Sequence, residues 1–422
     1  MTLTARPAAV IVDPFGSGSY LAPIFDKAGW DSIAVLSSTE LPSVFTSTMR
    51  PEEYAEILMP DDGLQAILQR LTAHAIVAVL PGMETGVELA DVIASHFGVP
   101  GNGTACSRSR RDKAAMGARL HLCGVPAAEQ ILTADESTLV HWATHHGKWP
   151  VVVKPTLSAG SDNVAICQTA LDVRHAFRCI IGKTNKLGAL NNAVLGQEFL
   201  EGQQYLVNTV SIEGKHYVGE IWSFDSTFEG GHQVYDRQLL LPPDGQLQDQ
   251  IVSYVYQVLD ALEIRHGAAH TEVMLTRDGP RLIESAARMT GKIGQATLLA
   301  AIGHHHISLY ADCCIEPDKV LARMPRYKMH NAVGIVALRS SLDGHIHDGQ
   351  GLSTLLALPT LVECIGGRLE PGTPVCRTVD LFTSPGLVYL LGSTSDEIDR
   401  DALVIRRIEA SGDLYVAGSR AP

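Results

Sequence analysis

The chain has 422 residues, of which 45% are hydrophobic and 19% charged, a composition typical of a globular protein with about two to four domains. The formal net charge of −13 argues against nucleic-acid binding, which needs a basic surface, although a nucleotide needs only a few local lysines. No apolar run approaches the roughly 18 residues of a membrane span, and the first residues lack a signal-peptide pattern, so we expect a cytoplasmic protein.

Residues 8–98 alternate apolar strand-like segments with helical ones. The segments AAVIVDP and SIAVLS flank a helical stretch at residues 15–30, and AIVAVLPG precedes another that ends at Gly98. This alternation predicts a parallel sheet with helices on its faces. Glu84 and Thr85 follow AIVAVLPG, and ligands bind at the carboxyl ends of strands in such sheets. The same two residues can equally cap the following helix.

A turn-rich basic segment, residues 101–113, predicts a domain boundary, and Lys113 begins a predicted helix. Beyond it, KWPVVVKP predicts a strand that carries Lys154 near its end, and a second strand follows at residues 164–167. The small residues 158–161 between these strands would let backbone N–H groups approach a phosphate. A lysine on an apolar strand needs an anionic partner. The alternative is an ordinary β-hairpin whose lysine reaches solvent.

Residues 192–210 predict two apolar strands separated by a polar break at Glu201 and Gly202. Such a break can expose the main-chain groups that an adenine edge requires, but it can also be an ordinary loop.

Three adjacent histidines stand at positions 304, 305 and 306. Consecutive helical residues point in different directions, so three adjacent imidazoles rarely bind one ion. We therefore expect separate environments for them.

Residues 267–291 predict a hairpin that places charged side chains on one face. Strands at 270–276 and 280–286 would be joined by a three-residue loop with Gly279 in the left-handed conformation. Pairing Thr276 with Pro280 would set Glu272 directly opposite Glu284.

Two facing carboxylates repel each other unless a cation lies between them, and their hard oxygen atoms suit magnesium together with phosphate oxygens. Side chains on a strand alternate between its two faces. The face of this pair would therefore also carry His270, Ala286 and Arg288. The alternative is a solvated hairpin whose acidic charges are neutralised by Arg288 and Arg281.

These features resemble those of the ATP-grasp superfamily. The resemblance covers about the first three quarters of the chain, and the features follow one another in the same order as in the superfamily. The resemblance implies that Lys113 and Lys154 contact phosphates, that Glu272 and Glu284 bind the metal, and that the catalytic Arg288 faces the transferred phosphoryl group. It also implies three groups of ATP-binding residues. Ser158, Gly160 and Ser161 would belong to a loop that covers the phosphates. The adenine-binding hinge would consist of Gln197, Glu198, Phe199 and Leu200, and Gln204 would contact the ribose. Gln197 and Gln204 stand where the superfamily usually has acids, and Ala286 stands where it usually has an asparagine ligand.

The motif IESAAR and the last hundred residues resemble the ligases in this superfamily that join two unprotected amino acids. The resemblance implies an α/β and α+β multidomain ATP-grasp fold with an N-terminal parallel-sheet βαβ domain and a small β-rich C-terminal region. The expected domains are residues 1–108, the small or lid subdomain 109–190, the large subdomain 191–325 with the metal hairpin, and 326–422. The implied activity forms a dipeptide, ADP and phosphate through an acyl phosphate, with Mg²⁺ or alternatively Mn²⁺, in a homodimer.

Residues expected near the amino-acid substrates are Glu84, Thr85, Glu220, His232 and Lys292, with surface loops as the alternative for each. Three other functions compete with dipeptide synthesis. A related ligase could act on an acid that is not an amino acid. A biotin-dependent carboxylase subunit is disfavoured because no Met-Lys-Met motif is present. A module that only binds nucleotide would not need Arg288.

Overall fold

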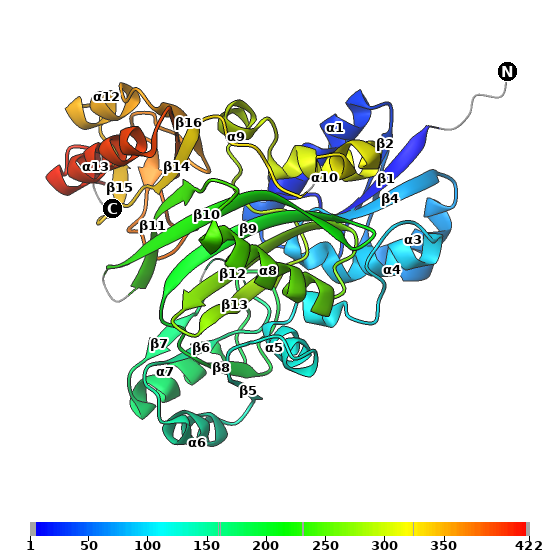
Figure 1. Ribbon diagram of the computed structural model, residues 1–422, viewed down its shortest axis with the longest axis horizontal. Coiled ribbons are helices and arrows are strands. Elements are labelled where there is room, and N and C mark those ends of the chain that lie inside the picture. Colours follow the sequence, from blue (N-terminus) through cyan, green and yellow to red (C-terminus); the bar gives the residue numbers. More distant parts are fainter. Residues whose placement is uncertain (1–5, 159, 161, 230–231, 324, 419–422) are drawn as a thin grey trace.

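The computed structural model describes residues 6–418, except residues 159, 161, 230–231 and 324. These residues form a four-stranded parallel sheet, a four-stranded antiparallel sheet, an eight-stranded sheet and a three-stranded sheet (Figure 1). No helix in the described part of the chain combines the length and apolar character needed to cross a membrane.

The N-terminal sheet is parallel, as predicted, with the strand order β3-β2-β1-β4. Alternate residues of β1 belong to two different hydrophobic cores, which explains its uninterrupted apolar sequence. The strand order reverses between β1 and β4, the point where open sheets of this kind bind ligands, and Glu84 follows β4 there. The elements are β1 (Pro7–Val12), η1 (Gly16–Tyr20), α1 (Leu21–Lys27), β2 (Asp31–Val35), α2 (Ser43–Thr46), η2 (Pro51–Glu53), β3 (Glu56–Leu58), η3 (Pro60–Asp62), α3 (Leu64–Leu71), β4 (Ala75–Pro81), η4 (Glu84–Gly86), α4 (Val87–Phe97) and η5 (Arg108–Arg110).

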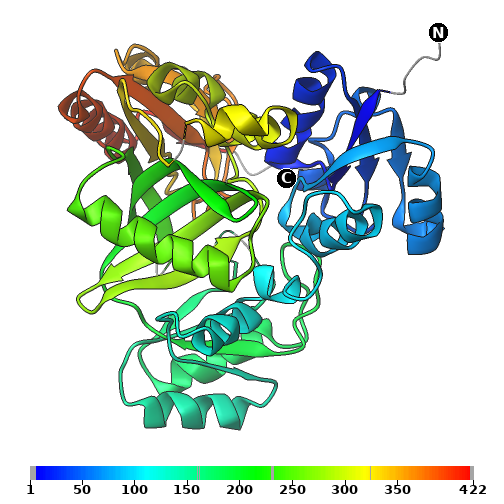
Figure 2. The same cartoon turned by 45° about the vertical axis from the view of Figure 1, so that its right-hand side comes forward.

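A small antiparallel sheet with the order β5-β8-β6-β7 forms the lower part of the molecule in both ribbon views (Figure 1, Figure 2). It has its own hydrophobic core, in which side chains of α6 and α7 pack against β6 and β8. We call this part the lid. Its elements, with the helix that precedes them, are α5 (Lys113–Leu122), β5 (Gln130–Thr133), α6 (Glu136–His146), β6 (Val151–Lys154), β7 (Ala165–Cys167), α7 (Ala170–Ile180) and β8 (Val194–Glu198).

The eight-stranded sheet has the order β13-β12-β9-β10-β11-β14-β18-β16 and runs through the centre of the molecule (Figure 1). Helix α8 packs against β10, β12 and β13, and α10 packs against β9 and β12. The elements up to residue 321 are β9 (Gln203–Ile212), β10 (Lys215–Glu229), β11 (His232–Leu240), α8 (Gln246–Ala261), β12 (Gly267–Thr276), β13 (Gly279–Ala286), α9 (Gln295–Ile302), α10 (His306–Ile315) and α11 (Pro317–Leu321).

The β12-β13 hairpin confirms the pairing of Glu272 with Glu284 but not the predicted loop. Thr276 pairs with Gly279, so the loop has two residues instead of three. A β-bulge next to Glu272 then adds one residue to β13 and restores the alignment of the two acids. Strict alternation of side chains carries no signal for a bulge, so the sequence did not predict it. The loop is one residue shorter than predicted and β13 has one extra residue at the bulge, so the two differences cancel and the pairing of the acids is as predicted.

The C-terminal region extends the central sheet, because β14 pairs antiparallel with β11. The sheet therefore continues across the boundary expected at residue 325. A three-stranded sheet, β17-β15-β19, completes the region. The elements are β14 (Ala332–Ala337), β15 (Gly344–Ile346), α12 (Gln350–Leu356), β16 (Leu361–Ile365), β17 (Pro374–Val375), β18 (Leu387–Gly392), α13 (Ser395–Ser411) and β19 (Tyr415–Ala417).

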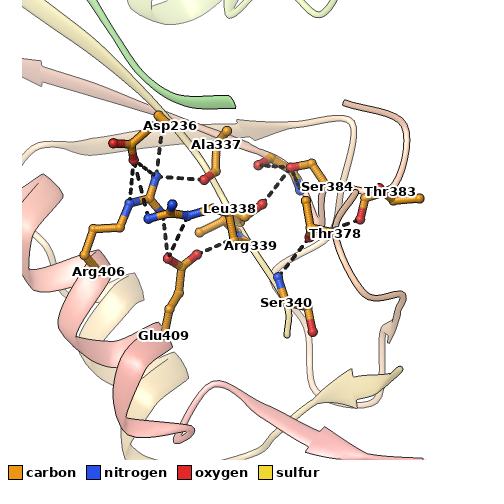
Figure 3. A network of polar contacts seen from close by, with 11 residues as sticks. Asp236, Ala337, Leu338, Arg339, Ser340, Thr378, Thr383, Ser384, Arg406 and Glu409 are labelled. Carbon is orange, nitrogen blue, oxygen red and sulfur yellow. Dashed lines mark hydrogen bonds and ion pairs between the residues drawn. The ribbon is translucent and has the colours of Figure 1, made fainter. Parts of the chain in front are cut away.

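A polar network connects α13 to the junction between β11 and β14, which we call the seam (Figure 3). Arg406 of α13 donates to the carboxylate of Asp236 at 2.9 Å and to the carbonyls of Asp236 and Ala337, each at 2.9 Å. It also pairs with Glu409, which accepts the Arg339 N–H at 2.7 Å. Because two of these acceptors are main-chain carbonyls, the contacts fix the helix to the strands themselves.

Candidate active site

The glutamates of the hairpin face a lysine that begins helix α5. The Nζ of Lys113 lies 2.8 Å from Oε1 of Glu284 and donates to the carbonyl of Ser158 at 2.6 Å. The Asp112 side chain caps α5 by accepting the N–H groups of Ala114 and Ala115. The cap fixes where the helix starts, and therefore where Lys113 enters the site.

Lys154 is buried at the end of β6, as the apolar sequence around it predicted, with 5% of its surface exposed. Burial, together with the positive charge of Lys113, lowers the pKa of Lys154 to about 8, against the opposing influence of Glu284 and Glu272. The hairpin acids therefore supply the negative charge that the buried ammonium requires.

Glu272 is held by side chains from neighbouring strands. The Nε2 of Gln204 donates to Oε2 of Glu272 at 3.0 Å, and the Nε2 of His270 lies 3.6 Å from Oε1. Burial raises the pKa of the Glu272 carboxyl, but His270 and the charges of Lys113 and Arg288 outweigh it, so the pKa lies below its ordinary value. An ionised carboxylate opposite Glu284 suits a divalent cation, and the ammonium of Lys113 already provides positive charge there.

An ion pair between Arg288 and Glu84 joins the hairpin to the N-terminal domain. The Arg288 Nε donates to Oε2 of Glu84 at 2.9 Å, and its Nη1 donates to the carbonyl of Met289 at 2.7 Å. Burial raises the pKa of Glu84, but the charges of Arg288, Arg111 and Lys113 outweigh this effect, so the pKa lies below its ordinary value. Glu84 is therefore an ionised carboxylate at the switch point of the N-terminal sheet.

Arg111 was not among the predicted site residues, although the sequence Arg-Arg-Asp-Lys signalled a basic segment. Its charge acts on Glu84, and its Nη1 is buried and has no hydrogen-bond partner among the described residues. A buried guanidinium donor near an ionised acid is suited to an anionic ligand.

The alternative in which Arg281 neutralises the hairpin acids does not fit the contacts. The Nη1 of Arg281 donates to the carbonyl of Pro280, next to the loop. The cations that contact or influence the two acids are instead Lys113, Lys154 and Arg288.

The other expected substrate residues have diverse surroundings. Thr85 donates its hydroxyl to the buried carboxylate of Asp13. Glu220 is 1% exposed, and its Oε2 accepts hydrogen bonds from Asn208 at 2.6 Å and Trp222 at 2.9 Å. Burial raises the pKa of Glu220.

Lys292, four residues after Arg288, donates to the carbonyl of Leu381 in the C-terminal region at 3.1 Å. His232 begins β11, and its side chain lies outside the described part of the structure.

The segments predicted to bind adenine and to cover the phosphates are residues 197–200, which lie where the lid meets the central sheet, and the loop after β6. Residues 199–202 connect β8 of the lid to β9 of the central sheet, as the polar break predicted. Gln197 is buried beside Gln130, the N–H of Glu198 donates to the carbonyl of Glu129 at 2.9 Å, and Phe199 is 38% exposed. Leu200 follows as part of the same connection.

The loop after β6 is anchored by the Ser158 hydroxyl, which donates to Asp162 at 2.7 Å. Gly160 adopts φ +65°, a conformation that favours glycine, and packs against the ring of Phe382 from the C-terminal region. Ser161 lies outside the described residues.

The three adjacent histidines are buried and bind separate partners, as expected. His304 contacts the carbonyl of Gly219 and His306 that of Thr209, whereas His305 caps α10 by accepting the N–H of Ser308. Burial lowers the pKa of His305 to about 4 and that of His306 to about 3. They are neutral structural groups at physiological pH.

The sequence and the fold are similar to those of known ligases. The ATP-grasp domain family matches residues 147–296. Dapdiamide A synthase from Enterobacter agglomerans is 31% identical over 99% of this chain and 98% of that protein, and the L-arginine-specific L-amino acid ligase from Bacillus subtilis is 22% identical over about half of each. Among solved structures, the L-amino acid ligase from Bacillus licheniformis superposes with a TM-score of 0.73 at 16% identity, over 99% of this chain and 100% of that one. Phosphoribosylglycinamide synthetase from Anaerococcus prevotii gives 0.65 at 15% identity, over 99% and 100% respectively, so the same fold carries different substrates.

Proposed function

Because this chain belongs to the ATP-grasp superfamily of ATP-dependent carboxylate–amine ligases, in the group that includes the L-amino acid ligases, we propose that it joins two L-amino acids. The products would be a dipeptide, ADP and phosphate. The observation that best supports the proposal is the convergence of two lysines and an arginine–glutamate pair around the two opposed carboxylates of the β12-β13 hairpin.

The chemistry needs an activated acid, because a free carboxylate is a poor electrophile. Transfer of the γ-phosphoryl group of ATP to one carboxylate oxygen gives an acyl phosphate and ADP. The amine of the second amino acid then attacks the acyl carbon, phosphate leaves, and the amine loses a proton. The protein contributes mainly positioning and charge neutralisation to such a reaction.

Lys113 and Lys154 would hold the phosphate oxygens of the nucleotide. For this, Lys113 exchanges its contact with Glu284 for a phosphate oxygen. Glu272 and Glu284 would hold a divalent cation, Mg²⁺ or alternatively Mn²⁺, which when bound supplies charge neutralisation for the transferred phosphate. Each charge-assisted hydrogen bond from these groups contributes about 1.5–3 kcal/mol.

Glu84 and Arg288 together complement an amino acid, which carries an ammonium and a carboxylate. Glu84 would accept the α-ammonium of the acid-donating substrate, and Arg288 would neutralise its carboxylate and then the acyl phosphate. Arg111 provides a further buried donor nearby.

The hinge at 197–200 would bind adenine through its main chain, and Gln204 would contact the ribose. The loop at 158–160 would cover the phosphates and exclude the water that hydrolyses an acyl phosphate. Thr85, Glu220, His232 and Lys292 receive no direct substrate role in this proposal.

The experiment is to incubate the purified chain with Mg-ATP and pools of free L-amino acids, measuring phosphate release and product masses. We expect ADP and phosphate together with a product whose mass equals two amino acids minus one water. The matched control is Arg288→Ala, which should release phosphate about 1,000-fold more slowly. Release only with bicarbonate would replace this function by carboxylation, and release with a non-amino-acid carboxylate and an amine would replace only the substrate class.

A further inference from the structure

A loop of the C-terminal region, residues 379–383, contacts the loop that follows β6 in the lid. We call the first the C-terminal loop and the second, residues 157–163, the covering loop. The ring of Phe382 packs against Gly160, where a Cβ atom would lie only 2.4 Å from Cε2 of the ring. Gly160 also adopts φ +65°, so its backbone conformation and the neighbouring ring both favour glycine.

A lysine of the lid binds the same C-terminal loop. Lys186 forms an ion pair with Asp380, and its Nζ lies 5.1 Å from the centre of the Phe382 ring. The main-chain N–H of Lys186 donates to Oδ2 of Asp162 at 2.9 Å, and the same oxygen accepts the Ser158 hydroxyl at 2.7 Å. Lys186 therefore connects the C-terminal loop to the hydrogen bonds that anchor the covering loop.

The C-terminal loop is also attached to the segment that carries Arg288. Lys292, four residues after Arg288, adopts φ +53°, which is uncommon for a residue with a side chain. Its Nζ donates to the carbonyl of Leu381 at 3.1 Å. From the N-terminal domain, the ring of Phe45 packs edge-on against Phe382, with the ring centroids 6.1 Å apart. The C-terminal loop therefore contacts the N-terminal domain, the lid and the segment after the metal hairpin.

Hydrogen bonds within the C-terminal loop fix its shape. Oδ1 of Asp380 accepts the N–H groups of Phe382 at 3.0 Å and Thr383 at 2.9 Å. Oγ1 of Thr383 accepts the N–H groups of Val379 at 2.9 Å and Asp380 at 3.0 Å. These side chains bond the backbone of their own turn and so restrict it. Phe382 keeps 36% of its surface exposed, so the turn and its neighbours, not a hydrophobic core, hold the ring.

We propose that Phe382 is a positioning residue of the active site: through it, the C-terminal loop holds the covering loop in place relative to the segment that carries Arg288. A covering loop that opens admits water, and addition of water to an acyl phosphate returns the free acid and inorganic phosphate. Phe382 thereby keeps phosphate release coupled to formation of the peptide bond. This coupling rests on the proposed function, whereas the restraint of the covering loop does not.

The first measurement is hydrogen–deuterium exchange of the main-chain amides between Lys154 and Ala165 in the full chain, with and without Mg-ADP. Phe382→Ala should speed this exchange about tenfold, because the covering loop loses an aromatic contact. The matched control is Leu356→Ala, which removes a half-exposed apolar side chain from α12 of the C-terminal region and should leave the exchange unchanged. Equal exchange in the wild type and Phe382→Ala would overturn the restraint, whether or not the protein forms dipeptides.

The second measurement compares phosphate with dipeptide during turnover. The wild type should release about one phosphate per dipeptide, and Phe382→Ala should release at least about three, because water competes with the amine. Leu356→Ala should keep the wild-type ratio. An unchanged ratio in a Phe382→Ala protein whose covering loop exchanges faster would overturn the role in excluding water. Absence of any dipeptide from the wild type would instead contradict the proposed function and leave the exchange result standing.

A double-mutant cycle tests the contact from the side of the lid. Gly160→Ala places a Cβ atom against the Phe382 ring, so it should speed exchange of the neighbouring amides in the wild-type background. The same substitution should have a smaller effect in Phe382→Ala, because the ring is absent. Equal effects of Gly160→Ala in both backgrounds would show that the ring does not restrain the covering loop.

Discussion

Two clusters of opposite charges in this molecule use similar side chains in different ways. The site cluster consists of Lys113, Glu284, Arg288 and Glu84, and the seam cluster consists of Arg406, Asp236, Arg339 and Glu409. In the seam cluster, Arg406 also binds two main-chain carbonyls that no ligand can replace. In the site cluster, Lys113 and Arg288 also donate to one main-chain carbonyl each, but their ion pairs are exchangeable: a phosphate can replace the acid, and a metal ion or an ammonium can replace the lysine or arginine. Exchangeable partners, more than the density of charge, distinguish a binding site from a structural joint.

The largest expected effect concerns Arg288. Arg288→Ala should lower kcat/KM for dipeptide formation about 1,000-fold, because a lost charge-stabilising donor at a reacting centre costs about 10²–10³ in rate. The assay is product formation by mass spectrometry, with circular dichroism to establish that the variant is folded. A loss of less than tenfold would remove the distinction between the two clusters.

Arg406 should show the opposite behaviour. Arg406→Ala should lower the free energy of unfolding by about 3 kcal/mol, because it removes one of the two cations beside Glu409 and Asp236 and leaves the carbonyls of Asp236 and Ala337 without their donor. Urea denaturation measures the change. The activity per folded molecule should equal that of the wild type, and a specific loss of kcat in the folded fraction would contradict the structural role of the seam.

A smaller effect should follow from the pKa of Lys154, which is about 8 in the ligand-free protein. As the pH rises through 8, the ammonium loses its proton, so ATP should bind about tenfold more weakly at pH 9 than at pH 7. The measurement is isothermal titration calorimetry without metal, and Lys154→Arg should abolish the dependence.

The same pKa shift affects folding with the opposite sign. Between about pH 8 and 10.5 the unfolded chain binds more protons at Lys154 than the folded chain, so the contribution of this group to stability rises with pH. Weaker ATP binding at pH 9 therefore cannot be attributed to unfolding caused by Lys154. An affinity that is constant from pH 7 to 9 would contradict the burial argument.

The smallest effect is expected at Arg281, which contacts only main-chain carbonyls near the hairpin loop among the contacts described. Arg281→Ala should change both the unfolding free energy and kcat/KM by less than about 0.5 kcal/mol. The two assays above measure it. A loss comparable to that of Arg288→Ala would revive the hypothesis that Arg281 neutralises the hairpin acids.

Local patterns predicted a substantial part of this molecule. Alternating apolar residues indicated the strands, and residue types on them indicated Lys154, Glu272 and Glu284, because each lies on a periodic element. Lys113 was indicated only by the resemblance to the ATP-grasp superfamily. The contact between Arg288 and Glu84 joins residues 204 positions apart, and no local pattern reports such a contact.

The hydrogen bond between Asn208 and His270 was missed for a similar reason. Asn208 lies on β9 and reaches His270 only because β9 and β12 are neighbours in the sheet. From sequence alone, Asn208 is a polar residue in an apolar strand. Likewise, the pairing of β11 with β14 depends on the folding of two distant segments and left no signal at residue 325.

The continuous central sheet has a practical consequence for exchanging parts between this enzyme and its relatives. A fragment that ended at residue 325 would leave β11 as an open edge able to pair with other chains, so it should aggregate. The lid, in contrast, has its own sheet and core and connects to the rest through short segments. Chimaeras that transplant the lid should therefore fold more readily than chimaeras that transplant the C-terminal region. A segment is exchangeable when it contains a whole β-sheet, whatever domain boundary the sequence indicates.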